Sequence, residues 1–375
     1  MSNKVRTIVI GAGIMGKSHL RDIVSMENTE LIGICDNDEA VLDEIDKEYD
    51  VPKYVSYLDA INADNLDAII ISTPHYDHTP ISIAALERGI HVLVEKPIAV
   101  HVNDAAKMIS AYEKARETYP NLIFAAMFMQ RTYGQWRKIK AMVDNGDLGT
   151  LIRTTWLITD WFRTQYYYDM GGWRATWEGE GGGVLMNQCP HNLDLYQWLV
   201  GMPSKIRGFA KFGKHHNIEV EDEVTGYFEH ANGMIGHFIT TTAESPGTNR
   251  LEIVGENGKL IFENGELVFY RNAHSSKKQI AEAQAGFEKV KFAKEIIDFE
   301  HHGKPGHRFI IENFADAILN ESVTLMAPAI EGINSVMLAN AIILSSHEGE
   351  TVDLPLDGNA FITLLDNFIT SPPTP

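Results

Sequence analysis

One short segment of the chain gathers three side chains that can hydrogen-bond or move protons. Asn187, His191 and Asp194 are spaced four and then three residues apart, and Trp198 follows four residues later. In a helix these positions lie along one face, so the polar groups would project in the same direction. A run of glycines at 181–183 stands just before the segment. The spacing is typical either of a catalytic face or of a helix that is polar on one side.

A proline inside this segment limits where the helix can begin. Pro190 lies between Asn187 and His191, and proline is tolerated only in the first turn of a helix. We therefore expect the helix to begin near Cys189 and Asn187 to lie in a separate turn before it. Asp194 can hydrogen-bond within its own helix, and this structural role is favoured over a catalytic one.

A lysine far upstream supplies a second candidate for acid–base chemistry. Lys96 lies in the tripeptide EKP at 95–97, directly after a run of apolar residues. A lysine in an exposed loop is usually only solvated, but Pro97 stiffens this loop. If the loop lies beside another positive charge, repulsion favours loss of a proton from the ammonium group. Lys96 would then be suited to hold or shuttle the proton of a hydroxyl that is being oxidised.

The N-terminal glycines indicate a bound dinucleotide, whose oxidised nicotinamide would carry such a positive charge. GAGIMG at 11–16 fits the pattern GxGxxG, follows an expected strand and opens an expected helix, and Asp36 lies 20 residues after the last glycine. In such a turn the first glycine allows a tight bend, the second admits a pyrophosphate and the third lets helix and strand pack closely. The helix N-terminus faces the phosphates. The predicted contacts of this segment are Gly11, Gly13, Ile14, Met15, Gly16 and Asp36. Because a carboxylate binds the adenosine ribose but repels a 2′-phosphate, we expect NAD rather than NADP.

The elements that position these residues follow two different patterns along the chain. Residues 5–125 alternate between apolar, β-branched runs and helical patterns, which predicts a parallel sheet covered by helices on both faces. From about residue 150 a long alternating strand and several runs broken by turns at 204–272 predict an antiparallel sheet. Late helical patterns cover 307–320 and 329–346. We predict a doubly wound Rossmann domain over 1–126 and, over 127–375, an α+β domain with a large open sheet.

Composition excludes several classes of function. The formal net charge is −19, so the surface would repel nucleic acid and anionic lipid. The sequence has no stretch of 18 or more apolar residues, so we predict no membrane span. The N-terminus has no pattern of a secretory signal, and we expect a cytoplasmic protein. The two cysteines, Cys35 and Cys189, form no metal motif and no disulfide framework, and buried inert thiols are expected.

A stretch rich in aromatic residues is the predicted substrate contact. Residues 160–182 combine tryptophans, tyrosines and arginines with many glycines. Aromatic faces stack on the C–H faces of sugar rings, and Arg or Trp N–H groups donate to hydroxyls. The candidates are Trp161, Arg163, Trp173 and Arg174. A packed loop or a contact between subunits would explain the same composition.

Together these motifs resemble the glucose–fructose oxidoreductase / inositol dehydrogenase (Gfo/Idh/MocA) family. The resemblance covers nearly the whole chain and rests on GAGIMG, the turn at Thr73–Pro74, EKP, and the GGG…H..D pattern. It implies a Rossmann domain and a second domain whose sheet forms the interface of a homodimer or homotetramer. It also implies a nicotinamide-dependent enzyme acting on sugars, cyclitols or related polyols.

The resemblance also implies roles for particular residues. Lys96 matches the family's catalytic lysine and His191 its acid/base histidine. Trp173–Arg174 resembles a pair that commonly precedes the glycine run near the pocket. The positions implied to line the nicotinamide side are Thr73, Pro74, His78 and Glu95. Asn187 departs from the pattern, because the family typically has an aspartate there. Asparagine can hydrogen-bond a hydroxyl but cannot take up its proton, so we expect His191 to accept the proton while Lys96 and Asn187 hold the hydroxyl.

Two further interpretations remain open from the sequence. The same oxidation could serve a glycosidase or lyase in which transiently reduced NAD returns the hydride after a leaving group departs. A non-catalytic NAD(H)-binding sensor is disfavoured because Lys96 and His191 are both present. Histidine clusters at 75–78, 215–216 and 300–302 have no second half with ligand spacing, and we expect no metal.

Overall fold

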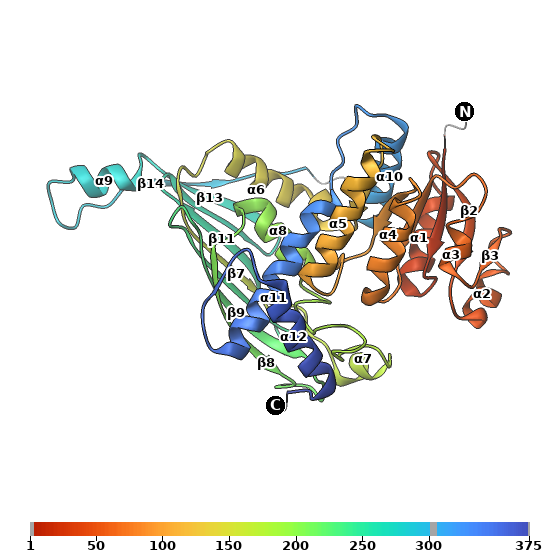
Figure 1. Ribbon diagram of the computed structural model, residues 1–375. Helices are drawn as coiled ribbons and strands as arrows, with labels where there is room; N and C mark the ends of the chain where they lie inside the picture. The colour runs from red at the N-terminus through yellow and green to blue at the C-terminus, as the bar shows by residue number, and fades with distance from the viewer. Residues whose placement is uncertain (1–3, 301–305, 374–375) are drawn as a thin grey trace. The chain divides into compact units, whose positions relative to one another are not determined.

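The computed structural model describes residues 4–300 and 306–373. In this part of the chain the residues form two compact units, each built from separate pieces of sequence (Figure 1). The first unit takes its residues from Met1–Tyr133, Gly179–Gly181 and His302–Met337. The second unit takes its residues from Gly134–Glu178, Gly182–His301 and Leu338–Pro375.

The first unit is built on a parallel sheet. Its described residues form six strands in the order β3-β2-β1-β4-β5-β6, and every pair runs parallel. The strands are β1 (Val5–Ile10), β2 (Thr29–Cys35), β3 (Lys53–Tyr54), β4 (Ala68–Ile71), β5 (His91–Val94) and β6 (Phe124–Ala126). This order is that of a doubly wound dinucleotide-binding sheet. The predicted Rossmann-type sheet is confirmed, and the two-residue strand β3 is the part that the sequence pattern did not predict.

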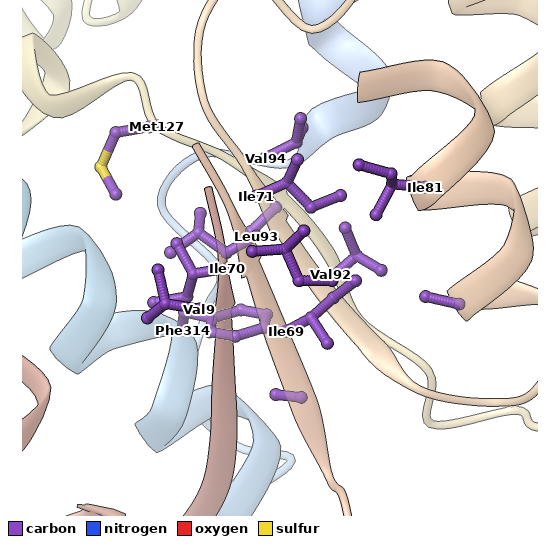
Figure 2. Packing of buried hydrophobic residues seen from close by; sticks show 14 of the residues in the cluster. Val9, Ile69, Ile70, Ile71, Ile81, Val92, Leu93, Val94, Met127 and Phe314 are labelled. Atoms are coloured by element: carbon purple, nitrogen blue, oxygen red, sulfur yellow. The ribbon is translucent and has the colours of Figure 1, made fainter. Parts of the chain in front are cut away.

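Helices that connect these strands complete the first unit. They are α1 (Ile14–Val24), α2 (Glu39–Ile45), α3 (Tyr57–Ala60), α4 (His78–Leu86) and α5 (Val102–Arg116), with short 3-10 turns η1 (His75–Asp77) and η2 (Met129–Thr132). A later helix, α10 (His307–Leu319), belongs to the same unit and packs on α1. Figure 2 shows its Phe314 among strand residues such as Val9 and Ile69. The β-branched strand residues are buried on both sides, as expected for a sheet covered on both faces.

The second unit is built on a larger, mostly antiparallel sheet. Its nine strands among the described residues have the order β14-β13-β12-β11-β7-β10-β9-β8-β15. Only the pair β7 and β10 runs parallel within this part of the chain. The strands are β7 (Leu151–Ile158), β8 (Lys205–Phe212), β9 (Glu221–Glu229), β10 (Ile235–Thr241), β11 (Asn249–Gly255), β12 (Gly258–Glu263), β13 (Glu266–Asn272), β14 (Phe292–Ile296) and β15 (Val352–Asp353). The predicted open antiparallel sheet is confirmed.

One face of this sheet is covered by helices. Trp136 of α6 packs on Trp156, and Tyr196 of α8 packs on Phe228. Phe368 of α12 contacts Phe212. The helices with residues in this unit are α6 (Gly134–Asp144), α7 (Gln165–Asp169), α8 (Pro190–Val200), α9 (Ser276–Glu282), α11 (Gly332–Glu348) and α12 (Gly358–Thr370), and the 3-10 turn η3 (Ala329–Glu331) precedes α11 in the first unit. Along β7 and β10 buried residues alternate with half-buried or exposed ones. The other face is therefore open in a single chain.

Among the described residues, one helical stretch is long and apolar enough to cross a membrane. It is Ala329–Glu348, and 67% of its most apolar window is buried inside the structure. Core helices of folded domains pass the same test, so this stretch is weak evidence for a membrane span.

Candidate active site

The glycine turn after β1 has a different steric reason for each glycine. Gly11 has a positive φ of 90°, and a methyl group there would lie 2.7 Å from the carbonyl carbon of Ser72. A methyl group at Gly16 would lie 2.0 Å from the carbonyl oxygen of Gly11. A methyl group at Gly13, in contrast, would meet no described atom within 4 Å. Gly11 and Gly16 are therefore needed by the protein itself, and Gly13 opens onto space at the start of α1.

The surroundings of this turn fit a dinucleotide. Asp36 accepts hydrogen bonds from the backbone N–H groups of Ala12 (2.7 Å) and Asp38 (2.9 Å), so its carboxylate stands beside the open turn. Ile14 is 79% exposed at the N-terminus of α1, where helix N–H groups favour an anion. The buried Oγ1 of Thr73, in the turn after β4, has no hydrogen-bond partner among the residues described. An open cradle, a ribose acceptor and an unsatisfied hydroxyl are what an NAD molecule would use.

The remaining residues predicted at this end lie in or beside the same turns. Met15 is the second residue of α1 and is half-buried, and Pro74 is exposed at the turn after β4. His78 opens α4 with its Nδ1 2.8 Å from the carbonyl oxygen of Pro97 and its Nε2 3.0 Å from that of Thr73. Burial lowers the pKa of His78, so the neutral ring donates to one carbonyl at a time. His78 thus joins the turn after β4 to the turn after β5.

Glu95 and Lys96 follow β5 and adjoin a buried acid–base cluster. Glu95 is buried and its Oε1 accepts a hydrogen bond from His19 Nε2 at 2.8 Å. Burial favours the neutral acid, but the His19 hydrogen bond and neighbouring positive charges lower the pKa of Glu95 to about 2. The Lys96 backbone N–H donates to Glu95 Oε2 at 3.1 Å, and the Lys96–Pro97 peptide bond is cis. The Glu95 carboxylate therefore fixes the backbone from which the Lys96 side chain projects. His19 was not identified from the sequence, because nothing in its spacing links it to residue 95.

In the second unit, a buried carboxylate shapes the turn that carries Asn187. Glu221 accepts hydrogen bonds from the N–H groups of Gly183 (2.8 Å) and Leu185 (3.0 Å). A methyl group at Gly183 would lie 2.1 Å from the Glu221 carbonyl oxygen, so this close approach requires glycine. Asn187 is half-buried, and its N–H donates to the Gly183 carbonyl. The predicted separate turn before the helix is confirmed.

The helix α8 begins at Pro190, as predicted from the proline. His191 lies in its first turn and is 5% exposed. Asp194 accepts a hydrogen bond from Gln197 of the same helix at 3.1 Å. Trp198 has the Lys140 ammonium 5.8 Å from its ring centre, so it packs toward α6. The residues expected along one helix face therefore do not act together, because Asn187 belongs to a turn and Asp194 and Trp198 make contacts within and between helices.

The two arginines among the predicted substrate residues converge on Tyr167, a residue that was not identified from the sequence. The guanidinium carbons of Arg163 and Arg174 each lie 5.0 Å from the Tyr167 ring centre. Arg163 also lies over Trp161, and Arg174 over Trp173. Tyr167 stands in a run of three tyrosines whose exposure differs from one to the next. Since no spacing in the sequence separates them, only the fold identifies Tyr167 as the centre of the cluster.

Tyr167 also connects this cluster to Asn187. Arg174 donates a hydrogen bond to the Tyr167 hydroxyl at 3.0 Å, and that hydroxyl donates to Asn187 Oδ1 at 3.3 Å. Gln188 Nε2 donates to the same Oδ1 at 3.0 Å. Two donors therefore orient the Asn187 amide, and a hydrogen-bond chain runs from Arg174 to Asn187.

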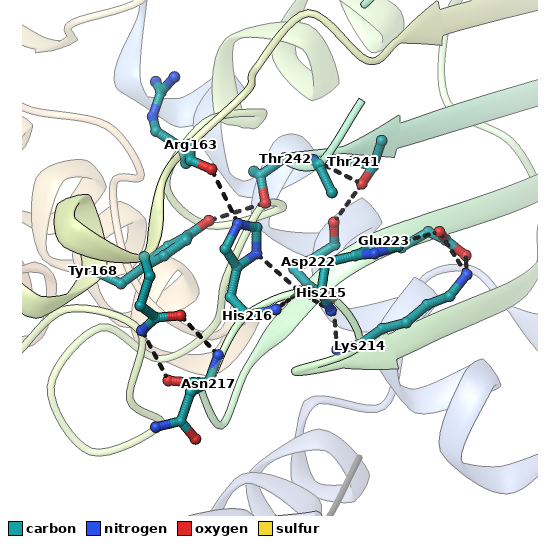
Figure 3. Close-up of polar contacts among 12 residues, drawn as sticks. Arg163, Tyr168, Lys214, His215, His216, Asn217, Asp222, Glu223, Thr241 and Thr242 are labelled. Atoms are coloured by element: carbon teal, nitrogen blue, oxygen red, sulfur yellow. Dashed lines mark hydrogen bonds and ion pairs between the residues drawn. The ribbon is translucent and has the colours of Figure 1, made fainter. Parts of the chain in front are cut away.

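The segment that carries Arg163 is fixed to the sheet by a second polar network (Figure 3). His216 lies between the Asp222 carboxylate and the Arg163 carbonyl, with 3.0 Å on each side. The Arg163 N–H donates to the Thr242 carbonyl at 2.8 Å, and Tyr168 donates to the Thr242 hydroxyl at 3.0 Å. The backbone at Arg163 is thus held from both sides.

The histidine clusters of the sequence have other partners in the structure. His75 Nδ1 lies 2.9 Å from the Glu180 carbonyl oxygen, and His215 pairs with Glu223. His301 and His302 lie outside the described residues. Within the described ranges, no three His, Cys, Asp or Glu side chains are grouped as a metal site. Cys35 and Cys189 are both buried free thiols, as expected.

Comparison with known proteins agrees with both units. Residues 5–120 match the GFO/IDH/MocA oxidoreductase family with an NAD-binding Rossmann fold, and residues 136–261 match the GFO/IDH/MocA C-terminal domain. A glycosyl hydrolase family 109 protein of Shewanella baltica is 29% identical over 267 residues, which cover 64% of this chain and 56% of that protein. The chain thus spans about half the length of this relative.

An inositol dehydrogenase and a solved structure are also similar. The scyllo-inositol 2-dehydrogenase (NAD⁺) of Bacillus subtilis is 24% identical over 267 residues, covering 69% of this chain and 74% of that protein. The WlbA dehydrogenase of Bordetella pertussis, in complex with NADH and UDP-GlcNAcA, is 25% identical with a TM-score of 0.78. The alignment covers 94% of this chain and 100% of that one.

Proposed function

The chain belongs to the GFO/IDH/MocA family of oxidoreductases with an NAD-binding Rossmann fold, and on this premise we propose that it transfers hydride between NAD and a secondary alcohol of a sugar, glycoside, anhydrosugar or cyclitol. The observation that carries the proposal is the glycine turn, which is open at Gly13 and has the Asp36 carboxylate beside it. The carboxylate favours a ribose with a free 2′-hydroxyl, and therefore NAD over NADP. The NADH complex of the similar Bordetella enzyme and the NAD⁺-dependent inositol dehydrogenase support the same cofactor.

The residues of the first unit would hold the cofactor. The backbone at 11–16 faces the pyrophosphate, and Asp36 accepts from the adenosine ribose. The residues proposed on the nicotinamide side are Thr73, Pro74, His78, Glu95 and Lys96. Bound NAD supplies the hydride acceptor. The Glu95 carboxylate fixes the Lys96 backbone, so the ammonium group can hold the substrate hydroxyl in one place.

Residues of the second unit would complete the reaction. As hydride leaves the carbon of the secondary alcohol, the hydroxyl proton passes to His191 and a ketone forms. Asn187 hydrogen-bonds the same hydroxyl and takes up no proton. Trp161, Arg163, Trp173 and Arg174 contact the rest of the substrate. The reaction balances, because the alcohol would lose one hydride to NAD and one proton to the imidazole.

Replacement of the proposed acid–base groups tests this mechanism. In Lys96→Ala and His191→Ala, turnover should fall about a hundredfold or more, since a positioned acid or base contributes that much. NADH binding, followed by nucleotide fluorescence, should stay nearly unchanged. The substrate is first found with cyclitols, monosaccharides and glycosides, each assayed with NAD and NADP. Turnover like that of the wild type in both variants would reject the assignment.

A second candidate function is favoured by the similarity to glycosyl hydrolase family 109 proteins. In a redox-assisted glycosidase, oxidation of the alcohol acidifies a neighbouring C–H group. A proton and the aglycone would then leave, and water would add to the resulting unsaturated ketone at the anomeric carbon and restore the C–H proton. The reduced nicotinamide would return its hydride to the ketone, so the sugar is hydrolysed with no net change of NAD. Net NADH production separates the two functions. A dehydrogenase accumulates NADH in step with product, whereas the redox-neutral enzyme releases aglycone with only a trace of cofactor.

We further propose that the chain forms a homodimer or homotetramer through the open face of its nine-stranded sheet. Paired residues form rows across this face, and one row contains Leu157, Ile239, Thr225 and Phe209. Phe209 is exposed and Leu157 and Ile239 are half-buried in the single chain. A mostly apolar row on an open sheet face is typical of an interface.

A further inference from the structure

Among the described residues, the arginines around Tyr167 have no acidic partner. The two guanidinium carbons each lie 5.0 Å from one ring centre, so the two positive charges are at most twice that distance apart. Neither Arg163 nor Arg174 pairs with a carboxylate of the described chain. In the same unit, Arg250 and Arg271 each pair with a glutamate. Arg207 has no carboxylate partner among the described residues either, but it donates to two backbone carbonyls. In a protein with a net charge of −19, an unneutralised pair of arginines is a local exception that attracts an anion.

The Arg163 side chain projects from a fixed backbone. The backbone carbonyl of Arg163 is held by His216, and its backbone N–H by the Thr242 carbonyl. Figure 3 shows the side chain directed away from the His216–Asp222 network. One guanidinium nitrogen donates to the Phe162 carbonyl at 2.9 Å, which leaves further donors of the five that arginine carries. A preordered guanidinium loses little side-chain freedom when it binds a ligand.

Other groups of the cluster match an anionic ring-shaped ligand. The buried Nε1 of Trp161 has no hydrogen-bond partner in the described ranges, and it adds a neutral donor beside Arg163. Position 187 carries an amide, so no negative charge stands at the end of the chain from Arg174 through Tyr167. The two hydrogen bonds of that chain measure 3.0 and 3.3 Å. Arg174 is therefore separated from Asn187 by a single hydroxyl group.

We propose that the substrate is a sugar that carries a carboxylate, and that Arg163 and Arg174 bind this group. The inference rests on the proposed function, since it takes Asn187 as the residue that holds the reacting hydroxyl. On such a sugar, the carboxylate and the reacting hydroxyl are separated by no more than the width of the ring. Asn187 and Arg174 are separated by two hydrogen bonds through the Tyr167 hydroxyl, which is a distance of similar size. Planar guanidinium groups bind planar carboxylates through paired hydrogen bonds.

Calorimetric titration of the NADH-bound protein with matched sugars tests the proposal. With NADH bound, an alcohol substrate cannot be oxidised, so only binding is measured. The ligands are glucuronate, galacturonate and mannuronate, the hexoses of the same configuration, and the 6-phosphates of those hexoses. At least one uronate should bind about tenfold to a hundredfold more tightly than its hexose and its 6-phosphate, and added salt should reduce the difference. No preference in any pair, or 6-phosphates that bind as tightly as the uronates, would overturn the proposal.

Variants assign the preference to the two arginines. Arg163→Gln and Arg174→Gln should each lower uronate affinity about tenfold or more and hexose affinity much less, so that the preference for the uronate falls. Asn187→Asp, which adds a carboxylate at the end of the same hydrogen-bond chain, should also weaken uronate binding. The control is Lys277→Gln on α9, which removes one positive charge from a side chain that is 81% exposed. Circular dichroism and the melting temperature check that each variant folds. A preference that survives in the double arginine variant contradicts the assignment.

The proposed function and the proposed carboxylate site can fail separately. If uronates bind preferentially but no sugar is oxidised with NAD, the proposed function fails and the carboxylate site stands. If NAD-dependent oxidation occurs with neutral sugars only, and no uronate is bound or oxidised, the carboxylate site is wrong and the proposed function stands.

Discussion

Asp36 combines a structural task with a selective one. Its carboxylate accepts from the Ala12 and Asp38 N–H groups, so it orders the glycine turn and the start of the next loop. The same negative charge stands where an adenosine ribose would lie. The residues that follow, Asn37 and Asp38, bring no positive charge to balance a 2′-phosphate. In the proposed function, selectivity for NAD would therefore depend on a single carboxylate that the turn itself keeps in place.

Asp36→Asn should reduce the discrimination between the two cofactors. The amide still accepts one hydrogen bond but no longer repels a phosphate, so the ratio of kcat/KM for NAD to that for NADP should fall about tenfold or more. The value for NAD itself should also fall. The ratio is measured with the substrate found in the panel of sugars. Asp43→Asn, an exposed carboxylate on α2, serves as control and should leave the ratio unchanged. A wild-type protein that prefers NADP would contradict the role of Asp36.

At the scale of elements, the turn between β1 and α1 separates what the fold needs from what a ligand needs. Gly11 and Gly16 would clash with the chain if they carried a side chain, whereas Gly13 would not. A sequence pattern alone cannot make this distinction, because all three glycines look alike in it.

Gly16→Ala should therefore lower stability, whereas Gly13→Ala should lower cofactor affinity. Gly16→Ala forces a contact with the Gly11 carbonyl and should lower the free energy of unfolding by about 1–3 kcal/mol without any cofactor. Gly13→Ala has an ordinary φ of −67° and open space, so its stability should change by less than about 1 kcal/mol. NADH affinity of Gly13→Ala should fall about tenfold, because the methyl group enters the space for the pyrophosphate. Chemical denaturation and nucleotide fluorescence measure the two effects. Unchanged NADH affinity in Gly13→Ala would argue against this cradle.

Local constraints decided how much of the fold could be predicted from the sequence. The start of α8 follows from Pro190, because proline restricts a helix to begin there. The strands of the first unit follow from β-branched runs that are buried on both faces. The pattern at 307–320 predicts a helix but not its partner, and α10 packs on α1. Helical periodicity tells which side of a helix is apolar, and it carries no information about which sheet that side will cover.

The candidate site was predictable to the same degree. Motif residues such as Lys96 and His191 could be identified from the sequence because their neighbours in the chain are distinctive. His19 and Tyr167 could not, because their partners Glu95 and Asn187 are distant along the sequence and meet them only through the fold. The roles of all these residues stay predictions until the variants are measured.

On the scale of the whole molecule, net charge and the open sheet face have opposite effects on the association of copies. A net charge of −19 opposes association of copies through electrostatic repulsion. The open face reduces this repulsion locally, since it carries pairs of opposite charges, such as Arg153 and Glu252, beside its apolar row. A stable interface needs about 800 Å² on each partner, and a face spanning several long strands supplies a surface of that kind.

Leu157→Asp tests whether copies associate through this face. Leu157 lies on β7, in the middle of the sheet order, and pairs with Ile239 across the strands. Burying its new carboxylate in an interface without a partner should shift a dimer or tetramer toward smaller species. Sedimentation velocity measures the shift over a range of protein concentrations, and NADH affinity shows that the first unit stays folded. Val24→Asp makes the same kind of change on α1, at a side chain that is 59% exposed, and should leave the assembly intact. A monomeric wild type, or a Leu157→Asp variant that assembles like it, would rule out this face as the interface.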